Sequence, residues 1–152
     1  MRTLRLLGIA AVCGLFSQPL FAASDNGIEH LTSESDFDTV IEQLNAALED
    51  NGFNVMATVD HAENAANNEL ELPPTTTFIF GNPKAGTPMM QCQGSVALDL
   101  PQKMVVRETD EGVRIEWNDP HYLAERHGLE ECDLPLDKVA GVLQTVAESA
   151  AE

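Results

Sequence analysis

The chain has 152 residues, of which 43% are hydrophobic, and this size and composition suit one domain built on one core. Its 25 acidic residues outnumber eight basic ones, which gives a formal net charge of −17 at pH 7. Because such a surface repels polyanions, nucleic acid and anionic membranes are excluded as expected partners.

The first 23 residues are typical of a secretory signal peptide. Arg2 and Arg5 precede a short apolar run over residues 6–16, and small residues follow at Ala22 and Ala23. We expect cleavage after one of these alanines, and a soluble periplasmic protein that is not inserted in the membrane. A retained N-terminal anchor is the alternative. Cleavage removes two of the eight basic residues, so six remain against 25 acidic ones.

Residues 24–34 are polar and unpatterned and are expected to form a flexible lead-in, so that residues 35–152 make up a single domain. A helix is predicted to start at Ser35 as N-cap and to end at Asn51-Gly52, because apolar residues recur at helical spacing between them. Residues 53–59 then alternate as a strand does, with Phe53, Val55, Ala57 and Val59 expected on one face. His61 follows directly, before a weakly helical stretch over residues 62–70.

The next segment predicts a buried strand, a loop and a helix start in succession. Residues 75–80 are β-branched or aromatic, glycines and Pro83 break the pattern over residues 81–86, and Thr87-Pro88 has the form of an N-cap followed by Pro at the first helical position. A short helix is expected from Pro88 to about Gln93. Free N–H groups at its start would favour an anionic group near Thr87.

Residues 103–108 and 113–117 flank a short polar segment and predict a β-hairpin. A helix is expected from Asp119-Pro120 through Arg126, and a final helix over residues 136–147. Together these elements predict an α+β fold: about four strands in a mainly antiparallel sheet, with helices packed on one face.

His61 is the first candidate ligand, since it follows a strand and precedes small residues that leave open space. A neutral imidazole binds iron, copper or zinc; the alternative is a histidine that only caps the strand end. Met89 and Met90 offer soft sulfur to haem iron or Cu(I), or they fill the core.

Three further residues are weaker candidates. Lys84 is one of the six cations of the mature chain and could pair with a carboxylate ligand such as a haem propionate. His127 suits the negative end of a helix dipole, and His121 is a second histidine near a helix start. Cys92 and Cys132 could form one disulfide in an oxidising compartment, or remain small buried thiols.

Three motifs together resemble the family called domain of unknown function 302. They are Asp60-His61-Ala62, the Phe-Gly-Asn-Pro and Gly-Thr-Pro elements within residues 80–88, and Asn118-Asp119-Pro120. The resemblance implies a compact α+β homodimer, and it suggests that some exported members bind haem b without a covalent link, near the subunit interface. It places the candidate ligand at His61.

The sequence therefore predicts a periplasmic homodimer that binds haem b, with His61 as axial ligand and Met89, Met90 or His127 on the opposite face. Its role would be electron transfer, or sensing or turnover of a peroxide or nitric oxide. No catalytic residue is assigned. One alternative is a copper-binding or copper-delivery module; another is a cofactor-free module whose acidic face docks a basic partner.

Overall fold

The protein is described by a computed structural model over residues 26–152, so the predicted signal peptide lies outside the described residues. Within this described range, five antiparallel strands form one open sheet in the order β1-β5-β4-β3-β2. Their bounds are β1 Ile28–Ser33, β2 Asn54–Asp60, β3 Thr75–Gly81, β4 Gln102–Thr109 and β5 Gly112–Asn118.

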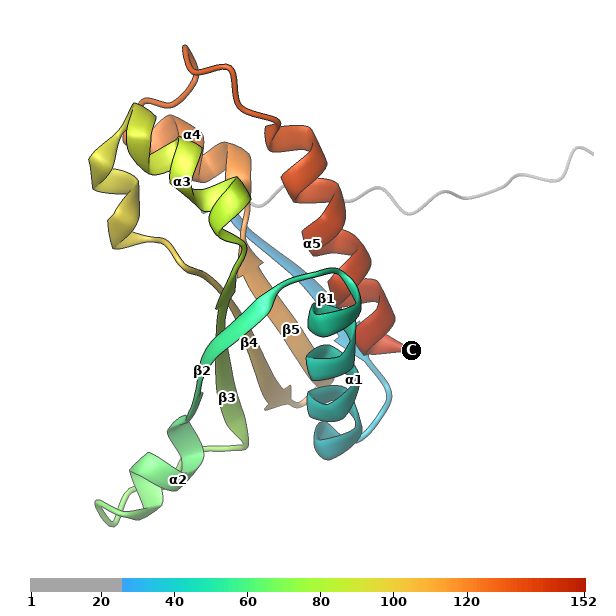
Figure 1. Cartoon of the computed structure of the whole chain (residues 1–152). Helices are drawn as coiled ribbons and strands as arrows, with labels where there is room; N and C mark the ends of the chain where they lie inside the picture. The colour runs from blue at the N-terminus through green and yellow to red at the C-terminus, as the bar shows by residue number, and fades with distance from the viewer. Residues whose placement is uncertain (1–25) are drawn as a thin grey trace, which may run out of the picture.

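In residues 26–152, five α-helices and one short 3₁₀ helix accompany the sheet. Two long helices, α1 and α5, lie side by side across one face, α3 and α4 lie at one end of the sheet, and α2 projects from the other end (Figure 1). Their bounds are α1 Phe37–Asp50, α2 His61–Ala66, α3 Pro83–Cys92, η1 Gly94–Leu98, α4 Pro120–His127 and α5 Leu136–Ala151. The prediction of a single α+β domain with helices on one sheet face is confirmed.

The main core lies between the sheet and the pair α1 and α5. Alternate residues of β4 and β5 point into it, as the two-residue period of a strand requires, and apolar residues three and four apart on both helices meet them. Among the described residues, the largest fully buried side chains are Phe80, Leu44, Leu48, Met104, Ile115, Leu123, Leu129, Leu143, Val40, Val96, Val106 and Val146.

The strand count corrects the sequence analysis, because residues 28–33 form a strand and not a flexible lead-in. β1 pairs antiparallel with β5 from Ile28 opposite Asn118 to Ser33 opposite Val113. As an edge strand it is held by backbone hydrogen bonds and buries few side chains, so its polar composition carried little strand signal.

The strand β2 also differs from the prediction that its apolar residues share one face. Val55 lies opposite Phe80 and Ala57 opposite Ile79, so Met56 is an extra residue in a β-bulge. Because a bulge shifts the alternation by one, Val55 is on the face of Phe80, whereas Ala57 and Val59 are on the other face.

Helix boundaries follow local capping chemistry. The N-cap of α1 is Asp36, whose carboxylate accepts a hydrogen bond from the Thr39 N–H at 3.0 Å, and not Ser35 as expected. The expected start of α4 is confirmed, with Asp119 as the N-cap; the helix ends at His127, one residue beyond the expected Arg126, and Gly128 follows with φ +67°. The predicted hairpin and final helix are confirmed as β4–β5 and α5.

The sheet face away from α1 and α5 carries a bidentate ion pair between neighbouring strands. Arg107 donates from Nε at 2.7 Å and from Nη2 at 2.9 Å to the carboxylate of Glu116. These hydrogen bonds lower the pKa of Glu116 from its ordinary value of 4.5. A carboxyl whose folded pKa lies below its unfolded pKa stabilises the fold above the unfolded pKa, and this contribution is lost as the pH falls through the folded pKa.

We therefore expect the free energy of unfolding to decline as the pH falls below about 4.5, in part through Glu116. Replacing Glu116→Gln should cost about 1–2 kcal/mol at pH 7 and should make this decline shallower. Urea unfolding of both proteins between pH 3 and pH 7 measures both quantities. An equal slope in the variant would contradict the assignment.

Candidate functional site

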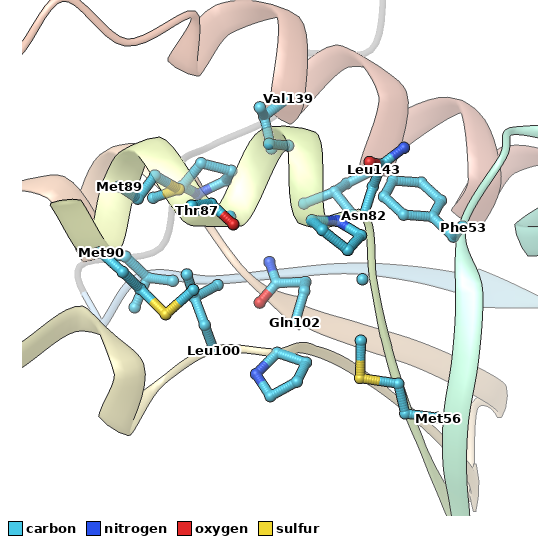
Figure 2. Close-up of a pocket in the computed structure, with 17 residues that line it drawn as sticks. Phe53, Met56, Asn82, Thr87, Met89, Met90, Leu100, Gln102, Val139 and Leu143 are labelled. Atoms are coloured by element: carbon cyan, nitrogen blue, oxygen red, sulfur yellow. The ribbon is translucent and has the colours of Figure 1, made fainter. Parts of the chain in front are cut away.

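A cavity of about 260 Å³ lies under α3, at the end of the sheet where β2 begins and β3 ends (Figure 2). Its wall is formed by one face of α3, the start of β2 and β4, and residues of α4 and α5. The surface of the cavity consists almost entirely of carbon and sulfur atoms. The residues that line it are Phe53, Met56, Gly81, Asn82, Pro83, Ala85, Gly86, Thr87, Met89, Met90, Leu100, Pro101, Gln102, Pro120, Leu123, Val139 and Leu143.

The helix α3 begins earlier than predicted, and this corrects the expected loop over residues 81–86. Asn82 is the N-cap and accepts a hydrogen bond from the Lys84 N–H at 3.0 Å, and Pro83 occupies the first helical position. Pro88 therefore lies inside the helix. The sequence contains two N-cap-plus-proline pairs five residues apart, and the helix begins at the first, so Thr87 lies within α3 and does not begin a helix as expected.

Three methionines line the cavity, from two different elements. Met89 is 6% exposed, whereas Met90 is 39% and Met56 55% exposed, so the last two form its rim. Figure 2 shows Met90 and Met56 on opposite sides of the view, with Leu100 between them. Methionine adapts to ligands of different shape because its side chain is unbranched and polarisable.

Gln102 is the buried polar side chain of the cavity, at 8% exposure. Its Nε2 donates to the Asn118 carbonyl at 2.9 Å, which fixes the amide orientation. The remaining oxygen, Oε1, lies 3.4 Å from the Lys103 N–H, at the long end of a hydrogen bond. This oxygen is therefore placed to accept a hydrogen bond from a bound molecule.

His61 lies away from the cavity. It is the first residue of α2, at the opposite end of β2 from the cavity, and Figure 1 shows α2 and α3 at opposite ends of the sheet. Its Nε2 is 2.8 Å from Thr77 Oγ1. The structure thus confirms that His61 directly follows a strand, but one subunit does not bring it together with Met89 or Met90.

Of the other predicted site residues, some line the cavity and some, like His61, lie outside it. Thr87 lines the cavity with Met89 and Met90, whereas Lys84 is exposed on α3 outside the lining. His127 is the last residue of α4, and its side chain is 5% exposed, with Nε2 2.5 Å from Asp99 Oδ2 and Nδ1 3.0 Å from Ser95 Oγ. Both of its ring nitrogens form hydrogen bonds, one to Ser95 in η1 and one to Asp99 directly after η1, so His127 connects α4 to η1.

A disulfide joins Cys92, the last residue of α3, to Cys132 in the segment between α4 and α5. The two Cα atoms are 6.5 Å apart, within the ordinary range for such a bond. Cys132 packs against a second apolar cluster, made of Met89, Val96, Ala124 and Leu129. The disulfide therefore connects the C-terminal end of α3 to the core beside the cavity.

Neither a cluster of metal ligands nor a membrane-spanning helix is found in the part of the chain that the structure describes. Among residues 26–152, no three or more His, Cys, Asp and Glu side chains gather where they could hold a metal ion. In the same range, every helix is too short or too polar to cross a membrane.

Sequence reasoning missed several residues of the cavity, above all Met56, Gln102 and Leu143. Met56 enters the wall because it is the bulged residue of β2, and a bulge leaves no trace in apolar periodicity. Gln102 and Leu143 arrive from β4 and α5, far along the chain. The available signal for Gln102 was its place after Pro101, two residues before Met104 and four before Val106, which puts its amide on the same strand face as these apolar residues.

Comparison with known proteins agrees with this fold. A family model described as "Domain of unknown function DUF302" matches residues 29–150. The chain belongs to this family. The resemblance drawn from its three motifs is thereby confirmed.

Among curated proteins, the chain is similar to "Fluoride-specific ion channel FluC 1" of Brucella suis biovar 1 (strain 1330), at 38% identity over 112 residues. The match covers 73% of this chain and 44% of that protein. A protein with the same name from Brucella abortus biovar 1 (strain 9-941) also matches at 38%, with 42% of its length covered. This DUF302 chain spans less than half of these relatives, so their printed activity is not carried over to it.

Among solved structures, the chain resembles an uncharacterized conserved DUF302 protein from Bacillus stearothermophilus. The TM-score is 0.67 at 19% sequence identity, and the match covers 82% of this chain and 95% of that one. At this identity the likeness establishes the fold alone.

Proposed function

We propose that this DUF302 protein binds a small, uncharged, mostly apolar molecule in the cavity under α3. The observation that carries the proposal is the cavity itself: about 260 Å³, lined by apolar side chains and backbone, with the buried Gln102 amide as its polar contact. Binding sites for small molecules combine an apolar wall with a few placed polar groups in this way, and this cavity is slightly smaller than their usual range of about 300–1,000 Å³.

Charge and hydrogen bonding narrow the ligand further. The net charge of −17 disfavours an anionic ligand such as a fatty acid, because it would enter a strongly negative potential. The oxygen Oε1 of Gln102 can accept a hydrogen bond from a donor on the ligand, such as a hydroxyl or an N–H group. The proposed class is therefore a neutral aromatic or aliphatic molecule that carries one hydrogen-bond donor.

A cavity-filling variant tests the proposal. Gly86 lies on α3, and a Cβ added there would point across the cavity to Leu100 Cδ1 at 3.8 Å without a clash. We expect Gly86→Leu to weaken binding of N-phenylnaphthylamine, a neutral apolar dye with one N–H group, at least about tenfold, because the new side chain occupies the ligand's space. Fluorescence titration measures the dissociation constant.

The matched control is Gly141→Leu. Gly141 is also in a helix, α5, and a Cβ added there meets no atom within 4 Å, so this change adds the same side chain outside the cavity. Its dissociation constant should equal that of the unchanged protein. Equal binding by Gly86→Leu, or failure of the unchanged protein to bind the dye, would overturn the proposal.

Haem b is a second proposed ligand, favoured by the thioethers of Met89 and Met90 in the same apolar wall. The macrocycle is larger than the cavity, so it would need α3 to move, and a haem bound to His61 would lie elsewhere, between subunits of the proposed homodimer. Absorption spectra after haem addition separate these cases. A haem at His61 predicts a Soret band that changes in His61→Ala, and a haem in the cavity predicts a change in Met90→Leu alone.

Copper is the remaining metal proposal, since three thioethers, those of Met56, Met89 and Met90, line one cavity and Cu(I) prefers soft sulfur ligands. Competition against a coloured Cu(I) chelator tests it: replacement of all three by Leu should abolish uptake if the site exists. We also propose that the protein is periplasmic. A basic protein partner that docks on the acidic surface is a further proposal, and it predicts binding that is weakened by salt.

A further inference from the structure

The wall of the cavity that α3 provides is held at three places. At its start, Asn82 caps the helix and donates from Nδ2 to the Gly52 carbonyl at 3.2 Å. Near its end, Met89 is the residue of α3 that is buried. At its last residue, the disulfide from Cys92 to Cys132 joins it to the segment before α5. The C-terminal half of α3 therefore depends on Met89 and on the disulfide.

The helix has little stability of its own. It is ten residues long, and isolated helices of this length are marginal in water. Pro88 lacks the N–H that would bond to the Lys84 carbonyl, and Gly86 lowers helix propensity further. Without a covalent attachment, we expect the part of α3 after Pro88 to open locally, since so little of it is buried.

The disulfide is accessible from one side. Cys92 is exposed, whereas Cys132 is half-buried against the cluster that contains Met89. A thiolate from solvent can therefore approach the sulfur of Cys92, with the sulfur of Cys132 as leaving group. Accessible disulfides of this kind are the ones that exchange readily.

We propose that the Cys92–Cys132 disulfide is an exchangeable redox site whose reaction partner is a dithiol reductant, and that its reduction releases the ligand held under α3. The proposal rests on the ligand-binding function proposed above and names its regulation. Oxidised, the disulfide fixes Met89 and Met90 in the cavity wall; reduced, it frees the end of α3 and the wall opens.

The chemistry balances as an ordinary exchange. One thiolate of the dithiol forms a bond to Cys92 Sγ, the bond between the two cysteine sulfurs breaks, and Cys132 leaves as a thiolate that takes up a proton. The second thiolate of the reductant then attacks the mixed disulfide and releases Cys92 as a thiolate, which is protonated. The protein disulfide gains two electrons and two protons, and the dithiol is oxidised to a disulfide.

The test is titration of N-phenylnaphthylamine against the oxidised protein, the protein reduced with dithiothreitol, and the Cys92→Ser/Cys132→Ser variant. Hydrogen exchange of backbone amides is followed in parallel. We expect reduction to weaken dye binding at least about tenfold and reoxidation to restore it, with faster exchange confined to residues 87–92. The double variant should bind like the reduced protein and should not respond to dithiothreitol.

Equal dye affinity in the oxidised and reduced proteins would overturn the proposal. Faster exchange throughout β3, β4 and β5 on reduction would also overturn it, because the disulfide would then support the whole fold and not α3 alone. If the oxidised protein fails to bind the dye, the ligand-binding function fails. A change in exchange confined to residues 87–92 would in that case still support redox control of α3.

Discussion

Replacing Phe80→Ala should lower the free energy of unfolding by about 4 kcal/mol, because truncation of a fully buried aromatic side chain removes its transfer free energy and leaves a cavity. Phe80 is 0% exposed and lies on β3, between Val55 of β2 and Gln102 of β4. Its ring meets that of Phe53 edge to face, with centroids 5.1 Å apart and an interplanar angle of 75°. Since small domains are stable by about 5–15 kcal/mol, this loss is a large share of the total.

Urea unfolding followed by circular dichroism measures the loss. Leu98→Ala is the control, since Leu98 is 79% exposed and its truncation should change stability by less than about 0.5 kcal/mol. Phe80→Leu should fall between the two, at about 1–2 kcal/mol, because it retains most of the buried volume. A loss below about 2 kcal/mol for Phe80→Ala would contradict the packing described for this ring.

Elements whose signals are local could be predicted from the sequence. Asp119 and Gly128 bound α4 through capping chemistry within the helix itself, and the β4–β5 hairpin is encoded by two strand patterns around a short turn. The helix α1 was predicted because its apolar face repeats over 14 residues.

Elements that depend on a choice between two local signals, or on pairing with another strand, could not be predicted from the sequence. Asn82-Pro83 and Thr87-Pro88 are equally good helix starts in sequence, and continuity with β3 decides for the first. The bulge at Met56 and the edge strand β1 are set by pairing with β3 and β5, which a single strand's periodicity does not contain.

The candidate site shows the same division. Residues 87–90 were singled out, and three of them line the cavity, because the irregular segment after β3 was recognised as a place for a ligand. His61 was also placed correctly after its strand, but an antiparallel hairpin puts the end of β2 beside the start of β3, and α3 leaves the end of β3. Residues that follow two neighbouring antiparallel strands, such as His61 after β2 and Met89 after β3, therefore lie at opposite ends of the sheet.

Replacing Gly112→Ala should lower the free energy of unfolding by about 3 kcal/mol, for two reasons that add at one residue. Gly112 opens β5 after the hairpin turn with φ +122°, a conformation that residues with a Cβ rarely adopt. A Cβ there would also lie 2.7 Å from the Ser33 carbonyl oxygen, at the end of β1. That oxygen belongs to the backbone, so the contact is relieved only if β1 and β5 separate.

Gly52→Ala separates the two causes. Gly52 follows α1 with φ +74°, and a Cβ there meets no atom within 4 Å, so this change adds backbone strain without a steric contact and should cost about 1 kcal/mol. Urea unfolding of both variants measures the difference, and hydrogen exchange in β1 locates it. β1 is an edge strand that pairs with β5 alone. We therefore expect the backbone amides of β1 to lose protection from exchange in Gly112→Ala and to keep it in Gly52→Ala. Equal stability of the two variants would contradict the close approach of β1 to the hairpin.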